Sequence, residues 1–133
     1  MEPQKPILIV EDEKSLMEAV RIKLTHDGFT TSCAGSAEEA EEIMKTTQPS
    51  LIWLDLMLPG MQGLDFLRKV RTTEEGAKIP VVVVSNSGSP DKIRESKELG
   101  VETYFVKADW RLEEIIDVVR TILSSSGQVQ AQP

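Results

Sequence analysis

The chain has 133 residues, 40% of them hydrophobic, which suits one globular domain with a single core. Its formal net charge of −7 argues against direct binding to nucleic acid or to an anionic membrane surface, because both are negatively charged. The single cysteine excludes an internal disulfide and favours a reducing, cytoplasmic location. The sequence has neither the apolar core of a signal peptide nor the roughly 18 apolar residues of a membrane span.

Short apolar runs alternate with longer amphipathic stretches along the chain. Each run is apolar at consecutive positions, which is typical of parallel strands that helices cover on both faces. Five strands are expected, at residues 6–10, 29–33, 51–54, 80–84 and 103–106.

Helices are expected between the first strands. Apolar residues recur at helical spacing over 16–24, and Gly28 stands where a left-handed C-terminal cap is expected. Ser36 followed by Glu39 forms a capping box, which indicates the start of a second helix. Residues 65–68 are assigned to an ordinary amphipathic helix without a chemical role.

The last two helices differ in how firmly they should be held. Ser89 precedes a helix expected over 90–99, which has few apolar side chains and should be loosely packed, and Gly100 is its expected cap. The helix expected over 110–123 has a broad apolar stripe and should pack firmly on the sheet.

The strict alternation of strand and helix predicts a parallel sheet with helices on both faces. The expected architecture is a flavodoxin-like (βα)5 three-layer α/β sandwich with strand order 2-1-3-4-5. Residues 1–123 form this domain, and residues 124–133 are expected to be a disordered polar tail or the stub of a linker.

Polar side chains follow four of the predicted strands. Glu11 and Asp12 follow the first strand, and Asp55, Ser85 and Lys107 follow the third, fourth and fifth. The carboxyl ends of parallel strands share one edge of the sheet, so these groups should converge where ligands bind. Three neighbouring carboxylates raise one another's pKa unless a cation joins them, and oxygen ligands favour Mg²⁺, with Mn²⁺ as the alternative.

Such a site suits phosphoryl transfer to a carboxylate. A carboxylate can attack phosphorus when a metal ion and a lysine neutralise the phosphoryl oxygens and a hydroxyl donates a hydrogen bond. Asp55 is the candidate nucleophile, Lys107 the fixed positive charge and Ser85 the donor. Helix capping by acidic residues is the competing interpretation, but it explains neither the convergence nor the lysine.

Four motifs in this order resemble those of response-regulator receiver domains of two-component signalling. They are Val-Glu-Asp-Glu at 10–13, Asp-Leu-Met-Leu-Pro-Gly-Met-Gln-Gly at 55–63, Val-Ser-Asn at 84–86 and Tyr-Phe-Val-Lys at 104–107. The resemblance spans about residues 5–123. It implies that Asp55 accepts a phosphoryl group from a sensor histidine kinase or a histidine phosphotransfer protein, and that the chain slowly dephosphorylates itself rather than acting as a conventional enzyme.

The resemblance also implies roles for individual residues. Glu11 and Asp12 match the acidic pair of the metal site, and the backbone carbonyl of Met57 matches its third protein ligand. Ser85 matches the hydroxyl residue that moves toward the phosphoryl group, and Tyr104 matches the aromatic residue that changes rotamer with it. This movement would remodel a surface of the fourth helix, fifth strand and fifth helix, where a downstream protein binds.

Two positions depart from the family pattern. Glu11 stands where aspartate is commoner, which lengthens the arm by one methylene and leaves room for a water between carboxylate and metal. Ala108 replaces the proline that usually follows the lysine, and a cis peptide bond before alanine costs about 2.5–4 kcal/mol. We predict that phosphorylation survives but that coupling through Lys107 is altered, so Ala108→Pro should change the phosphorylation rate or the phosphoryl lifetime.

Three other functions compete with this one. A phosphorylation-independent pseudo-receiver, acting as a protein-interaction module, is disfavoured by Asp55 and Lys107 but not by Ala108. A haloacid-dehalogenase-type phosphatase would need a second aspartate two positions after the nucleophile, where Met57 stands. A flavodoxin would need a phosphate-binding loop after the first strand, and the acidic residues 11–13 would repel a phosphate.

Overall fold

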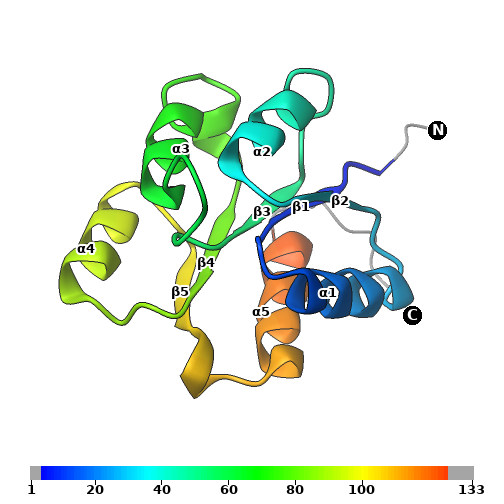
Figure 1. The fold of residues 1–133 in the computed structure, drawn as a ribbon. Helices are drawn as coiled ribbons and strands as arrows, with labels where there is room; N and C mark the ends of the chain where they lie inside the picture. The colour runs from blue at the N-terminus through cyan, green and yellow to red at the C-terminus, as the bar shows by residue number, and fades with distance from the viewer. Residues whose placement is uncertain (1–3, 126–133) are drawn as a thin grey trace.

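Five parallel strands form one sheet in the order β2-β1-β3-β4-β5, in a computed structural model that describes residues 4–125 (Figure 1). The strands are β1 (Ile7–Val10), β2 (Thr31–Ala34), β3 (Leu51–Leu54), β4 (Val81–Ser85) and β5 (Thr103–Val106). The predicted flavodoxin-like fold and strand order are confirmed. The largest difference in bounds is at β2, which begins at Thr31 rather than 29, because Phe29 belongs to the turn and its amide donates to Leu24 O at 3.0 Å.

Five α-helices and two short 3-10 turns connect the strands in the described part of the chain. The α-helices are α1 (Lys14–His26), α2 (Ala37–Met44), α3 (Gly63–Val70), α4 (Pro90–Glu98) and α5 (Leu112–Ser125). The 3-10 turns are η1 (Gly76–Lys78) and η2 (Lys107–Asp109). α5 continues through Ser125, so its predicted end at 123 is two residues early. Of the polar tail predicted for 124–133, the first two residues belong to α5, and residues 126–133 lie outside the described residues.

The local sequence signals mark the helix ends correctly. Ser36 Oγ accepts from the Glu39 amide at 3.1 Å, while the Glu39 carboxylate accepts from the Gly35 amide at 2.7 Å instead of closing on Ser36. Gly28 and Gly100 have φ values of 94° and 76°, as expected for left-handed caps.

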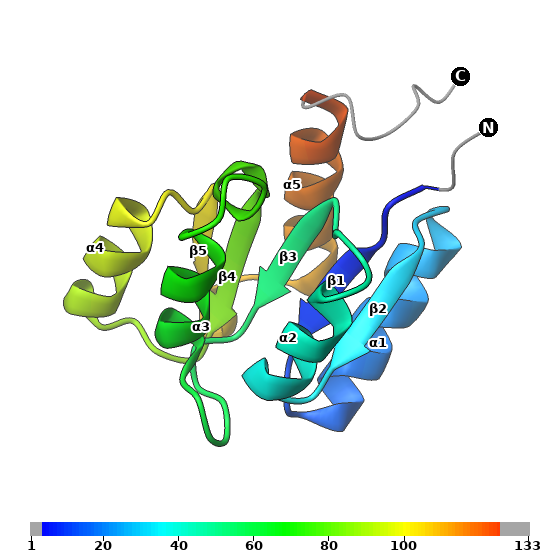
Figure 2. The same cartoon turned by 90° about the horizontal axis from the view of Figure 1, so that it is seen from above.

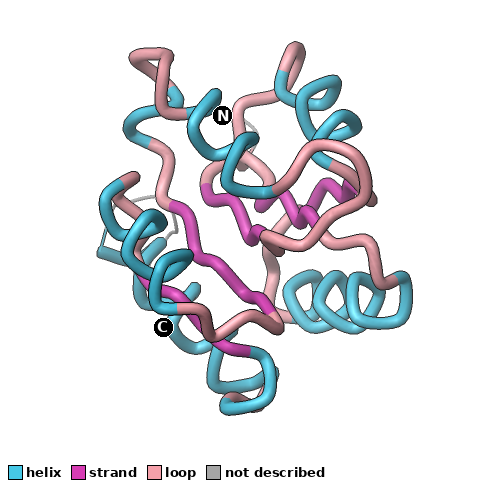
Figure 3. The backbone as a smooth tube through the Cα atoms, turned by 60° about the vertical axis from the view of Figure 1, so that its left-hand side comes forward, coloured by secondary structure: helices cyan, strands magenta, loops and turns pink. Residues whose placement is uncertain are grey.

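The helices cover the sheet in two layers (Figure 2). α1 and α5 pack on one face, in a core that includes Trp53 and Phe105. α2 and α3 pack on the other face, in a core that includes Leu54 and Phe66. Figure 3 shows the strands enclosed between these layers, which accounts for the uninterrupted apolar sequences of the fully buried strands β1 and β3. In residues 4–125, no helix is long and apolar enough to cross a bilayer.

Candidate functional site

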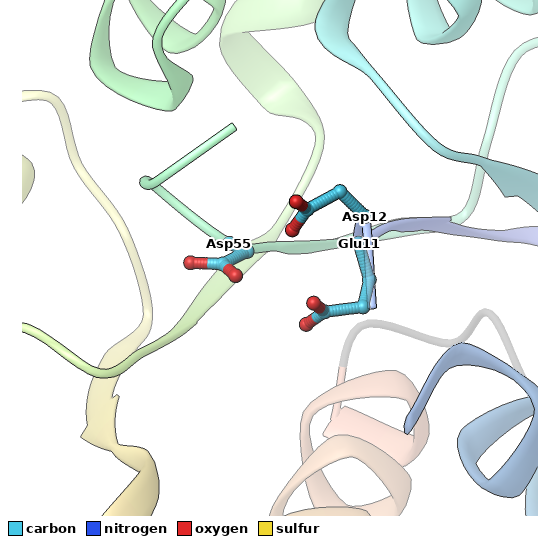
Figure 4. Close-up of side chains that lie close together, drawn as sticks. All are labelled: Glu11, Asp12 and Asp55. Atoms are coloured by element: carbon cyan, nitrogen blue, oxygen red, sulfur yellow. The ribbon is translucent and has the colours of Figure 1, made fainter. Parts of the chain in front are cut away.

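Three carboxylates meet at the carboxyl end of the sheet. Glu11 and Asp12 follow β1 and Asp55 follows β3, and these strands are direct neighbours with Val10 opposite Leu54. Oxygen atoms of the three side chains lie within 4.8 Å of one another, and Figure 4 shows the carboxyl groups gathered in one place. Glu11 is fully buried and Asp55 is 4% exposed, whereas Asp12 is open to solvent. The cluster can therefore be reached from the side of Asp12.

Helix capping does not explain these carboxylates. The N-cap of α1 is Glu13, whose side chain makes no capping hydrogen bond. Glu11 Oε2 accepts from the Glu13 amide at 3.1 Å, and Asp55 Oδ1 accepts from the Met57 amide at 3.1 Å. Each of these two hydrogen bonds orients one carboxylate oxygen toward an amide two residues further along the chain, and Asp12 accepts neither of them.

Lys107 joins the two buried carboxylates. Its Nζ lies 3.1 Å from Asp55 Oδ2, in a hydrogen bond, and 3.0 Å from Glu11 Oε1. The contact with Glu11 has the distance of an ion pair but not the direction of a hydrogen bond, so the ammonium balances the charge of Glu11 Oε1 without donating to it. The peptide bond between Lys107 and Ala108 is trans, and Lys107 reaches both carboxylates from the first position of η2. That Ala108→Pro changes the phosphorylation rate or the phosphoryl lifetime stays a prediction.

Burial and charge shift the pKa values of this pair. Burial, together with the negative charge of Asp55, raises the pKa of Glu11, and the contacts with Lys107 and the Glu13 amide offset only part of this rise. Burial lowers the pKa of Lys107, but the two carboxylates more than offset it, so the pKa lies above its ordinary value. Lys107 is therefore a fixed cation at neutral pH.

The cluster has the composition of a site for a hard divalent cation. Three ionised carboxylates and one ammonium give a formal charge of −2, much of it shielded from water. Buried Glu11 and Asp55 share the single positive charge of Lys107, which leaves negative charge for a cation to balance. Carboxylate oxygens are what Mg²⁺ and Mn²⁺ prefer, and the cluster contains neither a thiolate nor an imidazole that would favour zinc.

Ser85 and Tyr104 meet at the loop between β4 and α4. Ser85 ends β4, is fully buried, and its Oγ accepts from the Ser87 amide at 3.2 Å. The Tyr104 hydroxyl donates to Ser87 O at 2.6 Å, and burial raises the pKa of this phenol. Ser87 was missed by sequence reasoning, because both of its contacts here are made by its backbone and leave no mark on residue type.

The loop that follows Asp55 is tightly constrained. The Gly63 amide donates to Leu56 O at 2.8 Å, and a Cβ on Gly63 would lie 2.5 Å from Asp55 O. From α2, Glu38 Oε2 accepts from the Met61 amide at 2.9 Å. The Gly63 constraint could have been found from the 55–63 motif, whereas the contact of Glu38 depends on how α2 packs beside the loop.

The acidic site lies apart from the cavity beside α2 and α3. A cavity of about 540 Å³ is lined by residues of α2, α3 and η1, and none of the predicted site residues is among them. Asp12 at the site is open to solvent. The carboxylates can therefore be approached by a group of another molecule from the side of Asp12.

Comparison with known proteins gives one consistent family. The family described as "Response regulator receiver domain" matches residues 7–120. Sporulation initiation phosphotransferase F of Bacillus subtilis is 33% identical over 117 residues, which are 88% of this chain and 92% of that protein. Phosphate regulon transcriptional regulatory protein PhoB of Pseudomonas aeruginosa is 28% identical over 123 residues, 92% of this chain but 53% of that protein. The chain thus spans about half the length of several transcriptional regulators that it matches.

Solved structures agree with the fold. A CheY-like response regulator receiver domain protein from Methanospirillum hungatei superposes with a TM-score of 0.85 at 21% identity, covering 95% of this chain and 98% of that one. A response regulator receiver protein from Pseudomonas putida superposes with a TM-score of 0.83 at 25% identity, covering 91% and 99%.

Proposed function

Because the chain belongs to the response regulator receiver family, whose function is to accept a phosphoryl group, we propose that Asp55 is the acceptor and that the reaction requires Mg²⁺. One observation carries the assignment. Asp55 follows β3, the middle strand of the sheet, accepts a hydrogen bond from Lys107 Nζ at 3.1 Å, and lies with Glu11 and Asp12 in the acidic cluster.

The transfer needs little beyond positioning and charge. A carboxylate oxygen of Asp55 forms a bond to phosphorus as the bond between phosphorus and the imidazole nitrogen of the donor histidine breaks, and the bonding electrons return to that nitrogen. Lys107 carries a positive charge beside the forming bond and is held there by Glu11 as well as by Asp55. The amide of Met57 orients the Asp55 carboxylate through Oδ1.

We infer that Glu11, Asp12, Asp55 and the backbone carbonyl of Met57 hold the Mg²⁺ ion, which Mn²⁺ could replace. The converging oxygens of the three carboxylates support the side-chain ligands. The family resemblance supports the carbonyl of Met57. The bound ion supplies positive charge that offsets the phosphoryl oxygens.

The phosphoryl donor is proposed to be a sensor histidine kinase or a histidine phosphotransfer protein, and the target a protein that binds the α4-β5-α5 surface. Ser85 and Tyr104 support this, because both contact Ser87 in the loop that leads into α4. Movement of Ser85 toward a phosphoryl group on Asp55 would release the Ser87 amide. The loop would then be free to rearrange together with Tyr104.

Intact mass spectrometry tests the assignment. The protein is incubated with Mg²⁺ and acetyl phosphate, and one phosphoryl adduct is expected that disappears when Mg²⁺ is chelated. Asp55→Asn should abolish the adduct, while Asp109→Asn, an exposed aspartate in η2, should retain it. An adduct that persists in Asp55→Asn would show that another residue is the acceptor.

A further inference from the structure

Helix α4 has an unusually polar contact with the rest of the domain. Its only buried residue is Ser96, whose hydroxyl donates to Lys92 O of the same helix at 2.8 Å. Ile93 and Leu99 are only partly buried. In Figure 1, α4 lies at the edge of the molecule, beside β5 and α3. With so little apolar surface buried, the polar contacts at its two ends largely determine its position.

The C-terminal end of α4 is held by one arginine. Arg71, which follows α3, donates through Nε to Leu99 O at 2.7 Å and through Nη2 to Gly100 O at 3.2 Å. The same guanidinium donates through Nη1 to Gly76 O at 2.7 Å and to Ile79 O at 2.8 Å. One side chain therefore ties the turn after α4 to the connection between α3 and β4.

These contacts satisfy backbone groups that would otherwise lack partners. The last carbonyls of a helix have no N–H donor within the helix, and the helix dipole makes that end attractive to a cation. Hydrogen bonds from a charged donor are about twice as strong as those between neutral groups. The Arg71 side chain is partly buried, so water competes with these bonds less than it does at an exposed position.

The N-terminal end of α4 is held differently. Its cap is Ser89, whose Oγ accepts from the Lys92 amide at 3.5 Å, and the Ser89 amide in turn donates to Ser87 Oγ at 3.2 Å. These bonds join neutral groups and lead back to the loop that Ser85 and Tyr104 contact. A cavity of about 240 Å³ adjoins this half of the helix, lined by Leu56, Gln62, Leu64, Asp65, Arg68 and Lys92. The N-terminal half therefore has both weaker attachments and space into which it can move.

We propose that Arg71 fixes the C-terminal end of α4 as a pivot, so that phosphorylation of Asp55 displaces the N-terminal half of the helix and leaves the turn at residues 99–101 in place. The displacement rests on the proposed function of Asp55. Anchoring by Arg71 does not, because its contacts are present without a phosphoryl group.

Hydrogen–deuterium exchange tests the pivot in the wild-type protein. Exchange is compared before and after phosphorylation, with the phosphorylated fraction measured by intact mass. The amides of residues 91–94 should change their exchange rate by about tenfold or more, equivalent to 1.4 kcal/mol. The amides of Leu99, Gly100 and Val101, which donate to carbonyls within α4, should stay unchanged. Equal changes at both ends would overturn the pivot.

Two arginine variants test the anchor without phosphorylation. Arg71→Lys keeps the charge but cannot span four carbonyls with one ammonium, so the amides at 99–101 should exchange about tenfold faster. The matched control is Arg68→Lys, because Arg68 lies on α3, one turn before Arg71, and also contacts α4, at Glu95, but through an exposed ion pair of little energetic weight. It should leave those amides unchanged.

The outcomes separate the proposals. Faster exchange at 99–101 in Arg71→Lys alone supports the anchor. Equal exchange in both variants, or a uniform rise that includes the core amides of β1 and β3, would show that Arg71 does not hold α4 specifically. If intact mass shows no phosphoryl adduct in the wild type, the proposed function fails, while the Arg71→Lys comparison still decides the anchor.

Discussion

At the scale of single residues, Lys107 has two opposing effects. It neutralises charge beside Asp55, and its ammonium also occupies oxygens of Glu11 and Asp55 that a metal ion would use. Removing it should therefore separate metal binding from phosphoryl transfer. These two properties are usually expected to fall together when a site residue is lost.

We expect Lys107→Met to bind Mg²⁺ more tightly than the wild type. Its phosphorylation rate should fall by about a hundredfold, which is the typical effect of removing one group that stabilises an oxyanion. Metal binding would be measured by quenching of the fluorescence of Trp53, which is buried two residues before Asp55. All variants would carry Trp110→Phe, so that the exposed tryptophan does not contribute to the signal. Lys78→Met, in η1, is the charge-matched control. A wild-type phosphorylation rate in Lys107→Met would refute the role of the ammonium.

Gly63 limits where Asp55 can lie. A Cβ at this position would be 2.5 Å from Asp55 O and 2.6 Å from Leu56 Cα, both backbone atoms that cannot move aside freely. Gly63→Ala should therefore destabilise the fold by about 1–3 kcal/mol, measured by urea denaturation, and slow phosphorylation of Asp55. Gly88→Ala is the control, because its Cβ would meet only Val106 Cγ2, at 3.8 Å. Similar losses in both variants would mean that crowding at Asp55 is not the cause.

At the scale of secondary-structure elements, α2 supports the loop that follows Asp55. Glu38 Oε2 accepts from the Met61 amide, and a Cβ on Gly60 would lie 2.7 Å from the same oxygen. The hydrogen bond from Met61 lowers the pKa of Glu38, so the carboxylate is charged at neutral pH. The loop also contains Met57, the proposed carbonyl ligand.

Loss of this contact should loosen the proposed metal site. Glu38→Ala is expected to weaken Mg²⁺ binding severalfold in the fluorescence titration, with little change in the urea midpoint because the side chain is exposed. Glu38→Gln keeps an acceptor oxygen for the Met61 amide and should restore most of the affinity. If the two variants bind Mg²⁺ equally, the lost charge rather than the hydrogen bond is responsible.

The elements also show what the sequence could and could not predict. The strands followed from consecutive apolar residues, and Asp55 could be placed beside Glu11 because neighbouring parallel strands end at one edge. The four carbonyl contacts of Arg71 could not be predicted, since its acceptors are backbone atoms that any residue supplies. Contacts between side chain and backbone depend on how elements pack, which periodicity does not describe.

At the scale of the whole molecule, the site exists only in the folded chain. Glu11 and Asp12 are brought to Asp55 by the pairing of β1 with β3, and unfolding separates them. The chain order of strands and helices predicted this pairing, because short right-handed crossovers leave few alternative sheets. The formal net charge of −7 adds a general repulsion that a compact fold must overcome.

Mg²⁺ should therefore stabilise the entire domain. An ion that binds the folded state alone contributes about 2.7 kcal/mol at a concentration one hundred times its Kd, so the melting temperature should rise with the logarithm of Mg²⁺ concentration. Sodium chloride at matched ionic strength is the control, because screening of the net charge also stabilises the fold but does not require the cluster. Asp12→Asn removes the exposed ligand without opening the core and should abolish most of the Mg²⁺-specific rise. A rise that sodium chloride reproduces, or that survives in Asp12→Asn, would mean that Mg²⁺ acts through general screening and that the three carboxylates do not form its site.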